Sequence, residues 1–136
     1  MNDSIFLDQL RVFLARPGNR SPHNNFLGLE IVHLEHARAV LRVPYDARLA
    51  GNATTGVLHG GVITTAIDSA CGVSVITALG KRMGIATLDL RIDYLKPAQP
   101  GQAVTAAAHC YKVTRNICFV RAIAYHADRD DPLQHR

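Results

Sequence analysis

Aromatic residues are scarce in this chain of 136 residues, and its basic residues form no run. The chain has no tryptophan, four phenylalanines and four tyrosines, so it offers few rings that could stack on nucleic-acid bases. Its formal net charge of +4 comes from charges spread along the sequence. Nucleic-acid binding therefore has little support, whereas a mild positive charge suits an anionic small-molecule ligand.

Metal-ligand spacing is also missing from the sequence. The three cysteines, Cys71, Cys110 and Cys118, form no CxxC pair, and the seven histidines form no HxxxH pair. Such a set predicts free thiols in a reducing compartment and no zinc site. The first residues include Asp3 and Asp8 and lack a basic region followed by an apolar one, which argues against a secretory signal. We therefore expect a cytoplasmic protein without a metal.

The length and composition predict a single domain over residues 1–136. Hydrophobic residues make up 48% of the chain, and no segment is of low complexity. We expect the core to span about residues 27–126. Residues 1–18 should form a surface helix that ends at Pro17-Gly18, and residues 128–136 should be a frayed tail.

The longest apolar stretch, residues 62–79, follows the turn Gly-Val-Leu-His-Gly-Gly at residues 56–61. Small and aliphatic residues are mixed along it, which predicts a slim helix covered on most sides. The many hydroxyl side chains, Gly72 and Asp68 make it a poor membrane span. We therefore expect a helix inside a globular fold and no association with a membrane.

Asp68 is the only charged residue of this stretch, and no lysine or arginine lies between Gly60 and Gly80 to pair with it. A buried carboxylate without a counter-ion costs stability unless hydrogen bonds or a function retain it. One interpretation is an aspartate that faces a water-filled seam or bonds a distant backbone group. The other is an active-site carboxylate, because such groups collect at active sites.

Five other segments have the pattern of strands, at residues 27–35, 37–44, 85–95, 102–114 and 116–126. In 85–95 the residues Leu88, Leu90, Ile92 and Tyr94 alternate with polar ones, which predicts a strand with one buried face. Residues 19–25 read as a polar loop. The order predicts an α+β domain in which an antiparallel sheet of five to six strands wraps one long central helix.

This arrangement resembles the hotdog fold, and two motifs resemble those of a known family. The first is the turn at residues 56–61 with Asp68 nine residues after His59, and the second is residues 87–98. Both are similar to motifs of the acyl-CoA thioesterases of the 4-hydroxybenzoyl-CoA thioesterase superfamily, in the PaaI-like (phenylacetic-acid-degradation) subgroup. The resemblance extends over residues 27–125.

The resemblance implies hydrolysis of an acyl-CoA to a free acid and coenzyme A, with no cofactor besides the substrate. It implies that the Gly60 N–H binds the thioester carbonyl, that His59 positions the thioester, and that Asp68 is the base or nucleophile. A helix N-terminus suits an oxyanion that develops on an acyl carbon. Thr87 falls where the family often has a Ser or Thr that assists the attacking water. Contacts to the substrate are expected from Gly61, Arg91, Lys112, Arg115 and Asn116.

One position departs from the family pattern. These thioesterases often have an Asn or Gln six residues before the motif histidine, where this chain has Ala53, with Asn52 one residue earlier. Either the loop is one residue longer and Asn52 takes that role, or Asn52 only favours a turn after Gly51.

Two other functions of hotdog proteins need acidic residues at positions where this chain has none. Dehydratases of this fold need a carboxylate about four turns beyond the histidine, where Val73 stands. Hydratases place an aspartate shortly before it, where Thr54 and Thr55 stand. Both are disfavoured. An inactive hotdog protein that binds acyl-CoA or serves as a scaffold stays open, because a fold does not fix a function.

The expected helix also predicts an oligomer. At about 1.5 Å per residue, Asp68 lies roughly 12 Å along the axis from the Gly60 amide. A reacting carbonyl needs the oxyanion donor and the base within about 3 Å or one water further. We therefore expect two chains to share each site in a homodimer, and the resemblance implies that two dimers assemble into a homotetramer.

Overall fold

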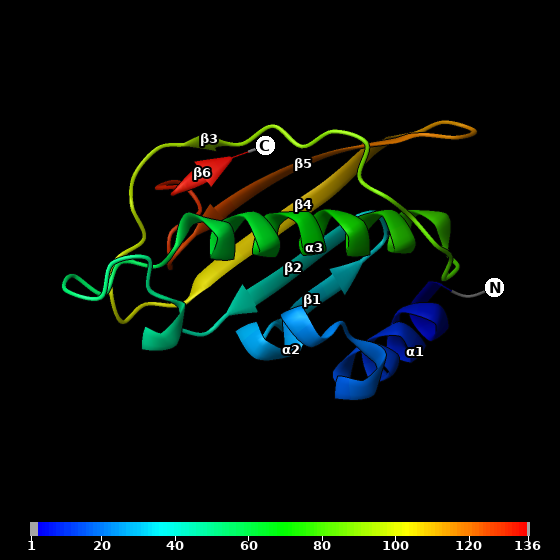
Figure 1. Ribbon diagram of the computed structural model, residues 1–136. Coiled ribbons are helices and arrows are strands. Elements are labelled where there is room, and N and C mark those ends of the chain that lie inside the picture. The colour runs from blue at the N-terminus through cyan, green and yellow to red at the C-terminus, as the bar shows by residue number, and fades with distance from the viewer. Residues whose placement is uncertain (1–2, 136) are drawn as a thin grey trace.

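A long helix lies across an antiparallel sheet in the computed structural model, which describes residues 3–135 (Figure 1). The helix is α3 (Gly60–Leu79), and it packs on β2 (Arg38–Val43), β4 (Val104–Val113) and β5 (Cys118–Tyr125), with β1 (Glu30–Glu35) at the margin. This is the expected α+β hotdog arrangement, so the prediction of the fold class is confirmed.

The sheet has six strands in the order β1-β2-β4-β5-β6-β3, and all pairs are antiparallel. Two of them are very short: β3 (Asp93–Tyr94) forms the outer edge, and β6 (Gln134–His135) lies between β3 and β5. The long central pairing joins β4 to β5, and the expected strands at 102–114 and 116–126 are both present.

The core lies between α3 and the inner face of the sheet. Large aliphatic side chains meet alanines there, and this lets the helix approach the strands closely. Ile67 is 1% exposed and Leu41 is fully buried, and burial of a side chain of this size contributes about 1.5–3 kcal/mol. Among the described residues, α3 alone has the length and apolar composition to cross a bilayer; here it packs against the sheet as the core helix.

The chain before the sheet is helical for longer than the sequence suggests. The predicted N-terminal helix is present as α1 (Asp3–Ala15), and its Phe6 and Leu10 pack on Leu34 and Ala39. The prediction of a loop at 19–25 is wrong, because η1 (Pro17–Asn19) and α2 (Pro22–Leu27) occupy this region.

Capping explains α2 although it has only six residues. The Ser21 side chain accepts a hydrogen bond from the Asn24 backbone N–H at 3.1 Å. Pro22 is the first helical residue, where its fixed φ suits the helix. Gly28 ends the helix in the left-handed conformation at φ 69°. These signals are in the sequence, but a helix this short shows no periodic apolar pattern.

Residues 85–95, named here the edge segment, do not form the predicted half-buried strand. Only Asp93–Tyr94 form ladder pairs, and the chain bends at Leu88, whose side chain is 78% exposed. The alternation is real, but the segment has no long strand beside it in a single chain. A strand pattern needs such a neighbour before a ladder can form.

The prediction of a frayed tail at 128–136 is also wrong for the part that the structure describes. The Leu133 side chain is 1% exposed in the core, and its backbone N–H donates to the Ala124 carbonyl at 2.7 Å. Lys96 and Asp131 form an ion pair that ties the tail to the residue directly after the edge segment. The buried leucine, the pairing of β6 with β3 and β5, and the ion pair together hold this segment, and a polar composition does not reveal them.

Candidate active site

His59 caps the N-terminus of α3 with its own side chain. Its Nδ1 accepts a hydrogen bond from the Gly61 backbone N–H at 2.9 Å, so the proton of the neutral ring is on Nε2. A Cβ on Gly61 would lie 2.9 Å from that Nδ1. Glycine at position 61 is therefore what allows the imidazole to fold back onto the helix.

The loop before α3 fixes the backbone of His59. The Gly51 N–H donates to the Val57 carbonyl and the His59 N–H donates to the Leu49 carbonyl, each at 2.9 Å. A Cβ on Gly51 would lie 3.0 Å from the His59 Cα, so the two strands of the loop touch at this glycine. The backbone of His59 can therefore lie this close to residue 51 because Gly51 has no side chain.

Asn52 shapes the same loop. Its Oδ1 accepts hydrogen bonds from the Thr54 and Thr55 backbone N–H groups at 2.9 and 3.2 Å, which is the bonding of an Asx turn. Asn52 is thus next to the predicted site, and its side-chain oxygen is used by the loop itself.

The first turn of α3 is open beneath Tyr94. Within residues 3–135, the Gly60 backbone N–H has no hydrogen-bond partner, as is usual for the first amides of a helix. The Tyr94 hydroxyl is 2.6 Å from the Thr64 Oγ1, and a Cβ on Gly60 would lie 3.5 Å from the Tyr94 ring. Tyr94 is a neighbour of the site that the sequence did not identify, because its alternation placed it among buried core residues.

Asp68 faces outward from α3 and is held by the edge segment. Its Oδ1 accepts a hydrogen bond from the Thr87 hydroxyl at 2.8 Å. The sequence suggested a buried carboxylate, but in the single chain Asp68 is exposed. The reason is that α3 is covered by the sheet on one side only, while the edge segment lies over part of the other side (Figure 1).

The contacts of the edge segment follow one stripe of α3. Tyr94 lies over Gly60 and Thr64, and Thr87 bonds Asp68. One turn further, a Cβ on Gly72 would lie 3.4 Å from the Ile85 Cδ1. Residues four apart share one side of a helix, so the oxyanion candidate and the carboxylate lie on the same stripe. They are nevertheless about 12 Å apart along the axis at about 1.5 Å per residue.

The one thiol close to this carboxylate is a poor nucleophile. Burial, and then the negative charge of Asp68, raises the pKa of Cys71 to about 12. Its thiol therefore stays protonated at neutral pH, and the thiolate is the reactive form. Within the described residues, no group of three His, Cys, Asp or Glu side chains is placed to hold a metal ion.

The predicted contacts to the substrate do not gather at the start of α3. Arg115 and Asn116 form the exposed turn between β4 and β5, and Lys112 stands just before it, 5.7 Å over the Phe119 ring. Figure 1 shows this hairpin reaching beyond the C-terminal end of α3, at the opposite end from Gly60. Arg91 is exposed on the edge segment and 3.6 Å from an Asp93 oxygen.

A long helix on an antiparallel sheet, with a His-Gly-Gly start and an outward carboxylate, defines a hotdog protein of the thioesterase type. A sequence profile of the thioesterase superfamily matches residues 55–132. The chain belongs to this superfamily.

Individual relatives agree with this assignment. The medium/long-chain acyl-CoA thioesterase YigI of Salmonella typhimurium is 32% identical over 121 residues, which cover 79% of this chain and 77% of YigI. A crystal structure of a Pseudomonas aeruginosa protein has 40% identity and a TM-score of 0.80, and the match covers 96% and 93% of the two chains. The PaaI protein of the E. coli phenylacetic acid degradation operon shares the fold, with 17% identity, a TM-score of 0.75 and coverage of 91% and 86%.

Proposed function

We propose that the chain is an acyl-CoA thioesterase that uses the Asp68 carboxylate and the amide end of α3. The observation that carries this proposal is the pairing of Thr87 with Asp68 on a helix whose Gly60 N–H is open. The membership of the superfamily and the similarity to YigI support the same reaction.

The proposed chemistry needs a hydrogen-bond donor for the thioester oxygen and a carboxylate near the acyl carbon. The Gly60 N–H, with the dipole of α3 behind it, stabilises negative charge on the thioester oxygen. Thr87 occupies one oxygen of Asp68, and the other oxygen can accept a proton from an attacking water or attack the acyl carbon itself. In the water route, the C–O bond forms, the proton moves to Asp68, the C–S bond breaks, and the thiolate of coenzyme A takes up a proton.

We propose that two chains share each site. About 12 Å separates Asp68 from the Gly60 amide of its own helix, which is too far for one thioester carbon to reach both. The edge segment exposes Ile85, Leu88 and Leu95 along the outer strand position of the sheet, where a second copy would cover them. A two-fold axis there places Gly60 of one chain opposite Asp68 of the other, twice per dimer, and two such dimers can form the tetramer.

The shared site also gives the hairpin residues a role. In a two-fold dimer with antiparallel helices, the hairpin of one chain lies near the start of the other α3. Lys112, Arg115 and Asn116 of that hairpin can then meet the phosphates of coenzyme A bound at the partner site. For the acyl group we propose a medium or long chain, as the name of YigI states for that relative, and an aromatic acyl group is the second candidate.

Release of thiol from a panel of acyl-CoAs tests this function. Purified protein should release coenzyme A from medium or long acyl-CoAs, and addition of a chelator should not change the rate. Inertness towards short, medium, long and aromatic acyl-CoAs would instead indicate an acyl-CoA-binding or scaffold protein.

The role of Asp68 can be separated from folding. Asp68→Asn keeps the shape and the exposed position of the side chain, and it should lower kcat about 100-fold or more. Asp89→Asn is a matched control, because Asp89 is an exposed carboxylate on the edge segment two residues after Thr87. If both variants keep full turnover, the assignment of Asp68 is wrong.

A further inference from the structure

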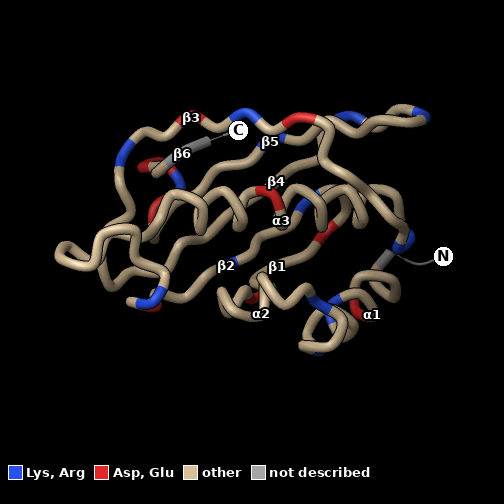
Figure 2. Tube along the Cα trace, in the orientation of Figure 1, with Lys and Arg blue, Asp and Glu red and all other residues tan. Residues whose placement is uncertain are grey.

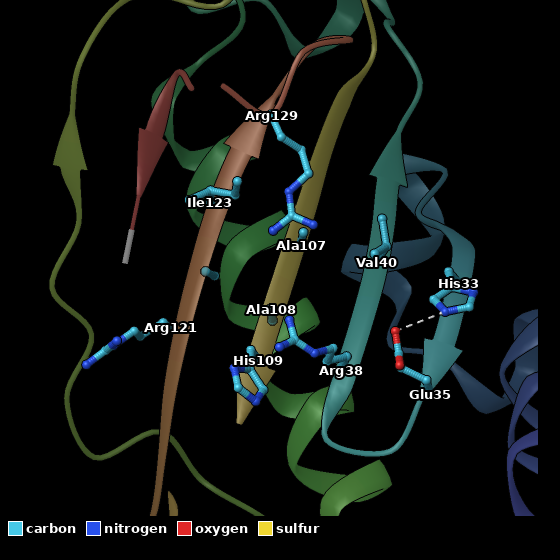
Figure 3. A pocket seen from close by; sticks show the side chains of 11 residues that line it. His33, Glu35, Arg38, Val40, Ala107, Ala108, His109, Arg121, Ile123 and Arg129 are labelled. Carbon is cyan, nitrogen blue, oxygen red and sulfur yellow. Dashed lines mark hydrogen bonds and ion pairs between the residues drawn. The ribbon is translucent and has the colours of Figure 1, made fainter. Parts of the chain in front are cut away.

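The outer face of the sheet, on the side away from α3, has a hollow of about 780 Å³ (Figure 3). The strand register explains its composition, because Arg38 of β2 pairs with His109 of β4, and His109 pairs with Arg121 of β5. Directly paired residues share one face of a sheet. A row of basic side chains therefore crosses three strands.

The floor of the hollow is made of small residues. Ala107 pairs with Val40 on one side and with Ile123 on the other, and this row runs beside the row of basic side chains. Arg129, from the chain after β5, reaches over Ala107, and Arg38 points towards His109 (Figure 3). Alanine at the centre leaves a space that longer side chains surround.

The hollow is positively charged with little compensation. No Asp or Glu occurs in residues 104–125, which comprise β4, β5 and their turn. Of the lining residues only Glu35 is acidic, and its Oε1 is 3.3 Å from the His33 Nε2. Desolvation, followed by the charges of Arg38 and Arg121, lowers the pKa of His109. The neutral ring of His109 can still donate one hydrogen bond to an anion.

The guanidinium groups are not equivalent. Figure 3 shows Arg121 turned away from the hollow, and its Cζ stacks 4.4 Å over the Tyr111 ring. The guanidinium groups of Arg38 and Arg129 thus remain in the hollow, above Ala107 and Ala108. A guanidinium fork matches the oxygens of a phosphate, and two forks suit more than one negative charge.

We propose that this hollow is a second binding site, separate from Asp68, for a diphosphate-bearing small molecule of nucleotide size. Its volume lies within the range of about 300–1,000 Å³ that is usual for small-molecule sites. A second copy of the chain is a poor occupant, because a two-fold contact through this face brings like charges together. The site lies on the other side of the sheet from α3, so it works independently of the proposed hydrolysis.

Calorimetric titration of the full chain with pyrophosphate, with ADP and with octanoate tests the proposal. Pyrophosphate and ADP should each bind once per chain, more weakly as salt is added, and octanoate should not bind at this face. Tighter binding of ADP assigns the site to a nucleotide, whereas equal affinities assign it to the diphosphate alone. Asp68→Asn should bind both as the unchanged protein does.

Variants of three arginines, two of them on β2, make the test specific. Arg38→Gln and Arg129→Gln should each raise the Kd for pyrophosphate about tenfold, and Arg38→Lys should recover part of the affinity. Arg42→Gln is the matched control, because Arg42 lies on the same face of β2, pairs with Glu30 at 3.3 Å and does not line the hollow. It should change the Kd less than about twofold.

Several results would overturn the proposal. These are no binding of pyrophosphate or ADP, binding of octanoate that Arg38→Gln weakens as much as it weakens pyrophosphate, or an equal loss of affinity in Arg42→Gln and Arg38→Gln. A change in oligomer mass on Arg38→Gln would place another copy over this face and would also contradict it.

Discussion

Gly61 and Gly60 are adjacent at the start of α3, but only one of them leaves room for the His59 side chain. A Cβ at position 61 would be 2.9 Å from the His59 Nδ1, whereas one at position 60 would be in ordinary contact with the Tyr94 ring. Gly61→Ala should therefore displace the cap and lower the free energy of unfolding by about 1 kcal/mol. Gly60→Ala should not lower it. Urea unfolding of both variants measures this difference. An equal loss of unfolding free energy in the two variants would show that the His59 cap contributes nothing.

The Cys71 thiol should be protected from alkylation while the chain is folded. Its pKa is raised to about 12 by burial and by Asp68, so almost no thiolate exists at pH 8. Mass spectrometry after iodoacetamide treatment should find Cys71 unmodified in the folded protein and modified in urea. Rapid modification of the folded protein would show that this part of α3 opens.

The same thiol predicts how stability depends on pH. The unfolded chain loses this proton near its ordinary pKa of 9.0, and the folded chain keeps it to about 12. Stability should therefore fall as the pH rises above about 9. Cys71→Ala should show a shallower fall between pH 8 and 10, and an unchanged slope would contradict this.

Some individual residues could be placed from the sequence, and others could not. His59, Gly60 and Asp68 are on one helix, so their relative positions follow from spacing alone. The family motif pointed to Thr87 as a residue that assists the attacking water, and the contact of its hydroxyl with Asp68 at 2.8 Å is a finding of the structure. Tyr94 could not be placed from the sequence. Its contact with Thr64 depends on how the loop after α3 brings the chain back over the helix, and no local sequence pattern determines the path of that loop.

At the scale of elements, the edge segment is the one whose sequence and structure differ most. Its alternation is as regular as that of β4 or β5, yet only Asp93–Tyr94 form a ladder. The strands at 102–114 and 116–126 were predictable because each supplies the neighbour of the other. The edge segment has no such neighbour within the single chain, and in the proposed dimer the second chain supplies one.

Hydrogen exchange can test this explanation of the edge segment. If the proposed dimer forms, the backbone amides of residues 85–92 should exchange quickly in dilute protein and slowly at concentrations at which the chains associate. The amides of β4 should be protected under both conditions and serve as the internal control. Equal exchange of residues 85–92 in monomer and dimer would place the interface elsewhere.

At the scale of the whole molecule, charge and contacts divide the protein into two faces. Asp68 is the only acidic residue of α3, and Figure 2 shows an acidic position near the middle of this helix. The outer face of the sheet carries the cationic hollow described above. The layer order was predictable from apolar patterns because helix and strands each bury one face. The hollow was not, because it depends on which side chains the register brings together.

The position of Asp68 and the Gly60 amide on two different chains is the central claim, and mixing two inactive variants tests it. Asp68→Asn removes the carboxylate. Gly60→Pro removes the N–H, and it suits the fold because proline is tolerated at the first helical position and the His59 ψ of 134° fits a residue before proline.

In an equal mixture with subunit exchange, half of the dimers are mixed and each has one complete site, so activity should return to about a quarter of the unchanged protein. Native mass spectrometry confirms that the mixed dimers are present. No recovery in mixed dimers, or full activity in a monomer, would contradict the shared site.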